Sequence, residues 1–539
     1  MSPSDAPTQA GLFETPRDER TSRTRASMLW AAYADALGFI SELVDEKGLR
    51  RRTRGKPLED LIDWRRRVGG RSGVDMDLPA GCWSDDTQLR MAVGRAIGPH
   101  GFDVEAFARI ELPVWPSYAL GGGRASKAAA AALGKSDALW YANQFDGWER
   151  AGGNGAAMRV QPHVWASPKL DGDFLSAVIK DSVCTHGHPR AIVGACFHAL
   201  TLAHCLQEGA VPDGDECLRL AESIRGAIRL IDQHRSLGPT WRGLWEKASG
   251  RSLDEAWEET VDELQHALSA ATTSGGSPDE AYDHICSSLG LDIEEQRGSG
   301  ILTPVAAVLL AGVQTSTREA VLTACNRLGT DTDTIATMVG ALMGAATPSD
   351  VPPSLPLDSE YLVREADRLS ALAAGGPTDP ARYPDLLVWA APRTQADALV
   401  VTDHGLVVEG LGPVEPLGDS AFSARRDFAW MWVRTTFGQT LLIKHRPDLP
   451  KQQPGNQAME LPLEQPSRPT TFSRTRRAQQ GSRPVPRRGG VNLDGAVDHV
   501  RGHPGDDAAL AYTLRRVARE GSLAELVALV VALRDDLRH

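Results

Sequence analysis

Two short acidic motifs hold the residues of this sequence that are best suited to chemistry: residues 83–87 (WSDDT) and residues 329–334 (GTDTDT). Each motif places two carboxylates and a hydroxyl within four residues. Such oxygens are hard ligands that suit Mg²⁺, Ca²⁺ or Mn²⁺, and neither motif contains a Cys or His to favour zinc. If the motifs meet in space, four carboxylates could hold two cations roughly 3.5–4 Å apart, a common arrangement for activating a water molecule.

Helix capping is the alternative interpretation of both motifs. Asp, Ser and Thr are ordinary N-caps, and one motif alone could simply satisfy free N–H groups and the helix dipole. Two motifs favour a metal site, because caps rarely need paired acids and crowded carboxylates without a cation would be unfavourable.

Helices are expected to position these motifs. Apolar residues recur with helical period after both, and Gly340, Ala341, Gly344 and Ala345 would allow close packing after the second. Few alternating strands occur before residue 347, so a mainly α core is expected. The helices are expected over residues 26–44, 85–98, 191–207, 215–233, 253–271, 317–327 and 334–346.

Composition indicates a water-soluble protein of two or three domains. The chain has 539 residues, 42% of them hydrophobic, and a formal net charge of −12. This charge argues against a generally nucleic-acid-binding surface. The seven cysteines form no CxxC, which favours buried thiols and a cytoplasmic location. No apolar run of 18 residues and no secretion signal is present, so no membrane association is expected.

The ends of the chain differ in composition from the core. Residues 1–22 are expected to form a disordered leader, and residues 348–446 a Pro-rich connector, with a helix near 359–373, and a small β-containing module. Strands are expected over 386–389, 398–401, 405–408 and 440–443, with a hairpin turn at 403–405.

An Arg-, Pro- and Gln-rich linker is expected over residues 447–490 and a helical segment over 491–539. The linker is either a plain tether or a site for nucleic acid or an acidic partner, and the tether is favoured. The last helix has an apolar face too wide for an exposed helix, so it is expected to dock against another element.

Three further segments could contribute to a site. Residues 152–159 form a glycine-rich turn that could approach a phosphate, although a plain tight turn is the likelier alternative. His186 and His188 precede a helix N-terminus; a zinc site is not favoured, and a hydrogen-bonded core histidine is the competing interpretation. Asp35 lies in an apolar helix, so its carboxylate needs either a hydrogen-bond partner or a place next to the ligands of a metal ion. For Glu42, the sequence alone favours a surface role.

In this order, the five segments resemble the ADP-ribosylglycohydrolase family, which includes the dinitrogenase-reductase-activating glycohydrolases. The family pattern GDALG…E corresponds to residues 34–38 and Glu42, and W-[ST]-D-D-T to residues 83–87. The patterns GNG-x-x-M-R, T-H-x-x-P and GGDTDT-x-A correspond to residues 153–159, 185–189 and 329–336. The match covers roughly residues 23–347; any one motif is weak, but the ordered set is highly specific.

The resemblance implies an orthogonal, multi-helix, all-α fold over residues 23–347, with two Mg²⁺ or Mn²⁺ ions and ADP-ribose in the cleft above them. The metal ligands that it implies are Ser84, Asp85, Asp86, Asp331, Asp333 and Thr334. The substrate-binding residues that it implies are Gly153, Asn154, Gly155, Met158 and His186. Ser84 and Thr330 depart from the commoner Thr and Gly, but all six ligand positions keep an oxygen side chain.

We therefore expect a metal-dependent hydrolase that removes ADP-ribose from a protein side chain or a nucleic acid. Asp85, Asp333 or Glu42 would accept the proton of the attacking water. Two alternatives remain open. The chain could be a non-catalytic ADP-ribose binder or an immunity-type protein that occludes a partner, or residues 380–539 could recruit the hydrolase to its partner.

Overall fold

Two compact units make up the chain in the computed structural model. The first unit takes in the described residues up to Ala381 together with Ala391–Gln452, and the second takes in Arg382–Ala390 and those from Gln453 onward. The structure describes residues 19–135, 138–272, 277–314, 316–379, 381–456, 493–502, 507–520 and 523–533.

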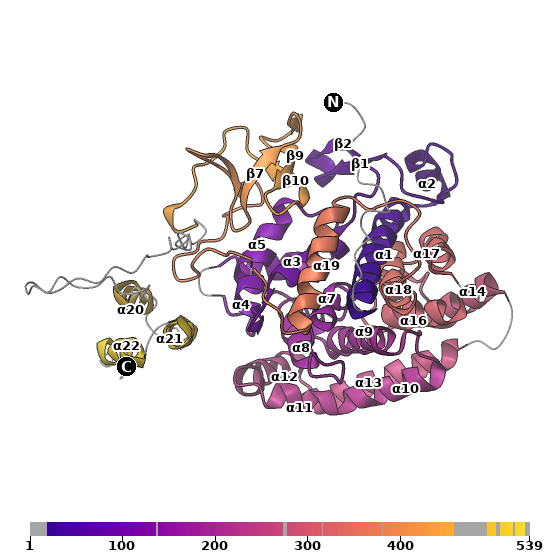
Figure 1. Cartoon of the computed structure of the whole chain (residues 1–539), viewed down its shortest axis with the longest axis horizontal. Helices are drawn as coiled ribbons and strands as arrows, with labels where there is room; N and C mark the ends of the chain where they lie inside the picture. The colour runs from indigo at the N-terminus through magenta and orange to yellow at the C-terminus, as the bar shows by residue number, and fades with distance from the viewer. Residues whose placement is uncertain are drawn as a thin grey trace, which may run out of the picture. The chain divides into compact units, whose positions relative to one another are not determined.

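Helices α1 (Glu19–Ser41) and α18 (Thr332–Ala346) pack along each other at the centre of the first unit (Figure 1). Their backbones nearly touch at glycines. A Cβ on Gly340 would lie 2.5 Å from the Trp30 carbonyl oxygen, and one on Gly344 would lie 2.6 Å from that of Ala26. The small residues of the second motif's helix therefore serve the close packing that the sequence predicted.

The other long helices surround this pair, so the expected mainly helical fold is confirmed. Helix α1 begins earlier than predicted, and the helix expected over 215–233 is broken into α10 and α11 by a 3₁₀ turn at Arg225–Ala227. The helices that pack around α1 and α18 are α3 (Asp85–Arg95), α9 (Pro189–Glu208), α16 (Leu302–Val313), α17 (Thr317–Asn326) and α19 (Ser359–Ala373). The remaining helices of eight or more residues in this unit are α6 (Arg124–Leu133), α8 (Leu175–Val183), α10 (Gly214–Ile224), α13 (Leu253–Ala271) and α14 (Pro278–Leu289). The shorter α-helices are α2 (Glu46–Arg52), α4 (Val104–Ala106), α5 (Leu112–Val114), α7 (Gln161–Trp165), α11 (Ile228–Asp232), α12 (Gly243–Ser249) and α15 (Glu294–Arg297).

The helical region also contains two small antiparallel sheets that were not predicted. Strand β1 (Trp64–Val68) pairs with β2 (Val74–Leu78), and β3 (Ile97–Gly98) pairs with β4 (Gly101–Phe102). The expectation of an all-α core is therefore correct only in part. Strand β1 escaped prediction because its outward positions are charged and only its ends, Trp64 and Val68, carry apolar side chains.

The β module is an antiparallel sheet with the strand order β10-β9-β7-β6-β5, and β8 pairs separately with β9. Three expected strands and the turn at 403–405 are present. The strands are β5 (Leu399–Thr402), β6 (Gly405–Val408), β7 (Gly412–Pro416), β8 (Ala421–Phe422), β9 (Ala429–Thr435) and β10 (Thr440–His445).

The strand predicted over 386–389 is wrong, since these residues form a turn. The Asp385 carboxylate accepts a hydrogen bond from Leu387 N at 3.0 Å, and the Asp385 carbonyl accepts from Val388 N and Trp389 N. This local bonding by an aspartate replaces the ladder of a sheet.

A buried arginine ties the β module to the helices of the first unit. Arg95, at the end of α3, forms a two-pronged ion pair with Glu111 at 2.7 and 2.8 Å. Its Nη1 also donates to the Gln439 side chain at 2.7 Å and to the Tyr361 hydroxyl at 3.0 Å. Its guanidinium lies 5.1 Å from the centre of the Phe437 ring. The β module therefore covers the buried charge of Arg95 and completes its hydrogen bonds, and losing these contacts would be unfavourable.

This arrangement predicts that two C-terminal truncations behave differently. A chain that ends at residue 452 keeps Gln439 and Phe437 and is expected to melt as the full chain does. A chain that ends at residue 380 uncovers Arg95 and is expected to melt several degrees lower. Thermal unfolding followed by circular dichroism checks this, and equal melting temperatures for the two truncated chains would contradict it.

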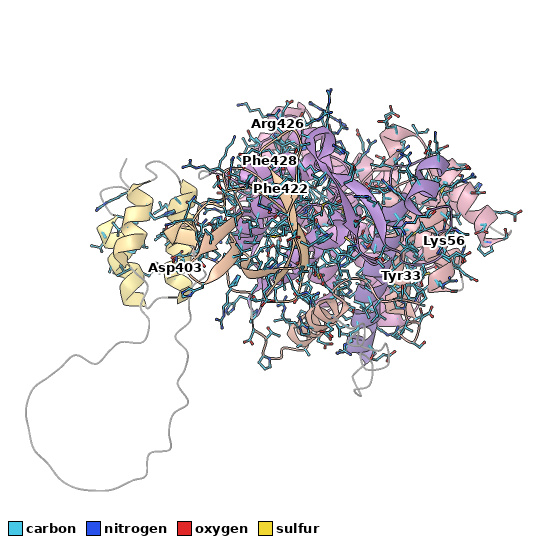
Figure 2. The ribbon with its side chains drawn as sticks, turned by 90° about the horizontal axis from the view of Figure 1, so that it is seen from above. Tyr33, Lys56, Asp403, Phe422, Arg426 and Phe428 are labelled. Atoms are coloured by element: carbon cyan, nitrogen blue, oxygen red, sulfur yellow. The ribbon has the colours of Figure 1, made fainter. Side chains whose placement is uncertain are left out.

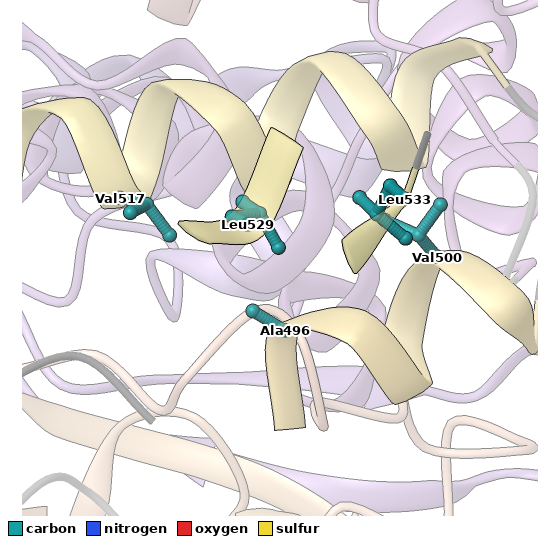
Figure 3. Close-up of a cluster of buried hydrophobic side chains, with 5 residues drawn as sticks. All are labelled: Ala496, Val500, Val517, Leu529 and Leu533. Carbon is teal, nitrogen blue, oxygen red and sulfur yellow. The ribbon is translucent and has the colours of Figure 1, made fainter. Parts of the chain in front are cut away.

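In the second unit, three helices pack around a small apolar core: α20 (Leu493–Arg501), α21 (Asp507–Glu520) and α22 (Leu523–Ala532). This core comprises Ala496, Val500, Val517, Leu529 and Leu533 (Figure 3). The last helix docks as expected on one side, although Val527, Val530 and Val531 are exposed. Most of the predicted linker, and residues 1–18 of the predicted leader, lie outside the described residues.

Two further expectations concern the chain as a whole. All seven cysteines are free and buried, as the sequence indicated. Among the helices that the structure describes, none combines the length and the apolar character that crossing a membrane requires.

Candidate active site

The first acidic motif forms the N-terminus of α3. Ser84 is the N-cap, and its Oγ accepts a hydrogen bond from Asp86 N at 3.2 Å. Asp35 of α1 accepts from Ser84 N at 3.1 Å and from Thr87 N at 2.9 Å. Asp35, which the sequence predicted to need a partner, thus binds two backbone N–H groups of the first motif. Because these hydroxyl and carboxylate groups cap the helix, Asp85 and Asp86 are not needed for that purpose.

The second motif forms the N-terminus of α18 and lies against the end of α1. A Cβ on Gly38 would lie 2.5 Å from Asp333 Cα, so the glycine lets the two helices meet at this level. Asp331 occupies the N-cap position but makes no capping side-chain bond, and Asp333 and Thr334 are buried. The motifs that were far apart in sequence are therefore brought together, because α1 contacts both helices that carry them.

The acids of the two motifs share one electrostatic environment. Burial, together with the charges of Glu42 and Asp35, raises the pKa of Asp85 to about 7, whereas the charge of Lys127 opposes the rise. A carboxyl with this pKa exchanges its proton near neutral pH, which suits general acid or base chemistry.

The pKa values of Asp86 and Asp333 are also raised. Burial is the main cause that raises the pKa of each well above the ordinary range, and Asp331 contributes to both. Asp86 adds to the rise at Asp333, and Asp86 Oδ1 is buried without a hydrogen-bond partner. A cation among these oxygens would remove the repulsion and satisfy the unpaired atom.

The glycine-rich turn lies beside this cluster. Asn154 Nδ2 donates to Asp331 Oδ2 at 2.7 Å and to Thr303 Oγ1 at 3.1 Å. The turn pairs with a second glycine segment, since Asn154 N donates to the Gly298 carbonyl at 2.9 Å and Gly300 N donates to that of Gly152 at 2.9 Å. The turn is thus a paired loop anchored to the second motif.

His186 lies on the other side of the same turn. A Cβ on Gly155 would come within 3.0 Å of the His186 ring, so only glycine fits there without movement. Arg159 binds the Gly155 carbonyl at 2.7 Å and Thr185 Oγ1 at 2.8 Å, which fixes the turn and the histidine segment together. Burial, helped by the Arg159 charge, lowers the pKa of His186 to about 3. His186 is therefore a neutral hydrogen-bonding group at physiological pH.

The other predicted residues differ in their surroundings. His188 caps α9 through Nδ1, which accepts from Arg190 N at 3.1 Å, so the pair of histidines does not act as one unit. Met158 is buried, and its carbonyl accepts a hydrogen bond from Arg90.

Glu42 lies at the edge of the acidic cluster, which corrects its interpretation as a simple surface acid. It is partly buried, and its charge contributes to the raised pKa values of Asp85 and Asp333. Its carboxylate pairs with Arg66 of β1 at 3.3 Å. Glu42 therefore interacts electrostatically with the acids of both motifs.

Several residues of the site were missed in the sequence. A Cβ on Gly121 would fall 2.2 Å from Asp85 Oδ1, so the loop at 121–123 lies directly on that acid. Arg90 is fully buried; its Nη1 donates to Thr87 Oγ1 at 3.1 Å and its Nη2 donates to Thr337 Oγ1. The loop's glycines were a visible signal, whereas Arg90 looked like a surface residue of an amphipathic helix.

Within the described residues, the predicted metal ligands do not form a preformed ion site. Over the described ranges, no group of three or more His, Cys, Asp or Glu side chains is arranged closely enough to hold an ion. The donor set nevertheless fits a hard cation, because it consists of hydroxyls and of carboxylates whose charges raise one another's pKa.

Comparison with known proteins identifies the family. The family model described as ADP-ribosylglycohydrolase matches residues 16–378, about two-thirds of the chain. A solved structure titled "ADP-ribosylglycohydrolase-related protein complex" is 21% identical, covers 66% of this chain and 100% of its own, and has a TM-score of 0.45. No curated protein matches the chain. The chain belongs to the ADP-ribosylglycohydrolase family.

Proposed function

We propose that this chain is a metal-dependent hydrolase that releases ADP-ribose from a modified acceptor. Membership of the family supports a hydrolase that acts on ADP-ribose. The observation that carries the proposal is the convergence of Asp85, Asp86, Asp331 and Asp333 at two helix N-termini beside a paired glycine loop. Asp85, Asp86 and Asp333 are buried, and pKa values raised as theirs are cluster at functional sites.

Two Mg²⁺ or Mn²⁺ ions would be held by Ser84, Asp85, Asp86, Asp331, Asp333 and Thr334. The family generally uses a binuclear metal centre. When bound, such ions supply positive charge that orients the ribose hydroxyls and lowers the pKa of a bound water. The unpaired Asp86 Oδ1 and the raised pKa values of Asp85, Asp86 and Asp333 support this assignment.

The substrate would lie along the glycine turn. Gly155 leaves room for the His186 ring, and Asn154 is held by Asp331 and Thr303, so the turn has a fixed shape against which the diphosphate would lie. Neutral His186 would offer a hydrogen bond to the nucleotide without adding charge. Met158 is proposed to line the same site.

Asp85, Asp333 and Glu42 are the proposed proton acceptors. The pKa of Asp85, about 7, suits the transfer of a proton from water. Glu42 has the side chain with the greater access to solvent, at 16% exposure, which suits exchange of that proton with bulk water. The neighbouring carboxylates would also stabilise positive charge developing at the anomeric carbon.

A substrate panel tests the proposed function. The full chain is incubated with ADP-ribosylated arginine, serine and DNA, with and without Mg²⁺ or Mn²⁺, and free ADP-ribose is measured. We expect release from at least one substrate in a metal-dependent manner. Binding of ADP-ribose without release from any of them would instead support a non-catalytic reader or occluding protein.

The arginine-rich linker gives a separate prediction about partners. Residues 466–490 contain seven arginines and no Asp or Glu, and they lie outside the described residues. If this segment recruits nucleic acid, affinity falls steeply with salt, and each phosphate contact adds close to one unit of slope. Glutamine at Arg474, Arg476, Arg477, Arg487 and Arg488 is expected to flatten that slope and leave hydrolysis intact. The favoured tether predicts no DNA or RNA retention at physiological salt in a filter-binding titration of either version.

A further inference from the structure

The active-site acid Glu42 is held from outside the helical core by an arginine on the β1–β2 hairpin. Arg66 Nη1 donates to Glu42 Oε2 at 3.3 Å. The Arg66 side chain is 22% exposed and the Glu42 side chain is 16% exposed, so the pair is shielded from most of the solvent. At this burial an ion pair is screened less than a surface pair and constrains the geometry of both side chains.

Arginine–aromatic contacts fix Arg66 in turn. Its guanidinium lies 4.5 Å from the centre of the Phe39 ring, and Phe39 meets Trp64 edge to face at 5.2 Å. Arg52 lies 5.0 Å from the centre of the Trp64 ring, and its Nη1 donates to the Glu42 carbonyl at 3.0 Å. Both arginines therefore converge on Glu42, one on its main chain and one on its carboxylate.

Strand register aims Arg66 inward. Trp64, Arg66 and Val68 occupy the inward positions of β1, whereas Arg65 and Arg67 are exposed and lie near Asp77 and Asp75 across the hairpin. Arg65 thus has the same charge on the same strand but faces away from Glu42.

The far end of the hairpin rests on the β module. A Cβ on Gly69 would lie 2.3 Å from the Trp430 ring, so the hairpin turn sits directly on this buried side chain of β9. Ser423 Oγ donates to the Ser72 carbonyl at 2.6 Å. Ser423 follows β8 in the loop that leads to β9; Figure 2 labels Phe422 of β8 and Arg426 and Phe428 of this loop. The hairpin therefore spans from the active-site acid to the β module.

We propose that Arg66 is a positioning residue for Glu42, and that the β module braces the hairpin that carries it. This inference rests on the proposed function, in which Glu42 accepts a proton. Glu42 faces other acids whose charges repel it, and without Arg66 its carboxylate would turn away from them. A displacement of about 1 Å at a reacting group can cost up to about a hundredfold in rate. The contribution of the β module to catalysis is then mechanical support.

A double-mutant cycle measures this coupling. Arg66→Gln is expected to lower kcat about tenfold or more with KM changed by less than about twofold. Arg66→Lys is expected to recover part of the loss, because it keeps the charge without the planar fork. In a Glu42→Gln background, Arg66→Gln is expected to change kcat less than about twofold, since its target is gone. Arg65→Gln, the matched control, is expected to hydrolyse at the wild-type rate.

Two further measurements separate positioning from general damage. Thermal unfolding of the metal-free protein is expected to show coupling between Arg66→Gln and Glu42→Gln and none between Arg65→Gln and Glu42→Gln. Trp430→Ala is expected to lower kcat in the same direction as Arg66→Gln, whereas Phe422→Ala, at a side chain that is 62% exposed, is expected to have no effect.

The outcomes distinguish this inference from the function on which it rests. A wild-type chain that releases no ADP-ribose from any substrate overturns both. An active wild-type chain whose Arg66→Gln variant keeps its kcat, or loses as much in the Glu42→Gln background as in wild type, overturns the positioning role alone.

Discussion

Replacing Asp85 or Asp333 with asparagine is expected to lower turnover by about a hundredfold or more. Each substitution removes a negative charge that would hold a cation, and loss of one such electrostatic contribution costs about 10²–10³ in rate. Initial rates of ADP-ribose release at saturating metal measure the effect. Each asparagine keeps the size of the side chain, so a folding defect is not expected.

Two controls sharpen this prediction. Asp77→Asn removes a carboxylate from an exposed position of β2 and is expected to have no effect on rate. Ser84→Ala is expected to have a smaller effect on turnover than the aspartate variants, because water can replace a neutral ligand. It should also cost about 1 kcal/mol of stability, since Ser84 Oγ caps α3. Near wild-type hydrolysis by both aspartate variants with metal bound would show that the site is assigned wrongly.

The second large effect is expected in stability, as a joint function of metal and pH. Asp85, Asp86 and Asp333 have folded-state pKa values above their ordinary ones, so the unfolded chain ionises more readily. Without metal, the stability of the fold should therefore fall as pH rises from about 4 towards 7. A cation that binds only the folded state reverses this, and at a hundred times its Kd it adds about 2.7 kcal/mol.

Melting curves with and without metal at two pH values measure this effect. Millimolar Mg²⁺ or Mn²⁺ is expected to raise the melting temperature by a few degrees at pH near 7.5 and by less near pH 5.5, where protons compete for the carboxylates. EDTA is expected to abolish the rise. If millimolar metal leaves the melting temperature of the wild-type chain unchanged at both pH values, helix capping would be favoured as the role of both motifs.

Much of the site could be predicted because its signals are local. The acids of both motifs stand beside regular helical patterns, so α3 begins at Asp85 as predicted, and α18 begins at Thr332, close to its predicted start at residue 334. The small residues of α18 correctly predicted close packing of this helix, which the structure shows against α1. The capping alternative was also partly right, since Ser84 does cap α3 while the acids beside it do not.

The parts that escaped prediction depend on contacts between distant segments. Arg66 gave no sign of its role, because a run of three arginines ordinarily marks a solvated surface. Arg90 and Arg95 occupy helical positions typical of exposed residues, yet their partners Thr337 and Gln439 are 247 and 344 residues away in sequence. Strand β9 is apolar on both faces and lacks the alternation that identifies a half-buried strand.

Anomalous diffraction from crystals grown with Mn²⁺ tests the central claim most directly, because it locates the ions without an assay. We predict two strong peaks between the N-termini of α3 and α18, within bonding distance of Asp85, Asp86, Asp331 and Asp333. We also predict that these peaks weaken or vanish in the Asp85→Asn variant. The absence of any peak at this cluster at saturating Mn²⁺ would contradict the account.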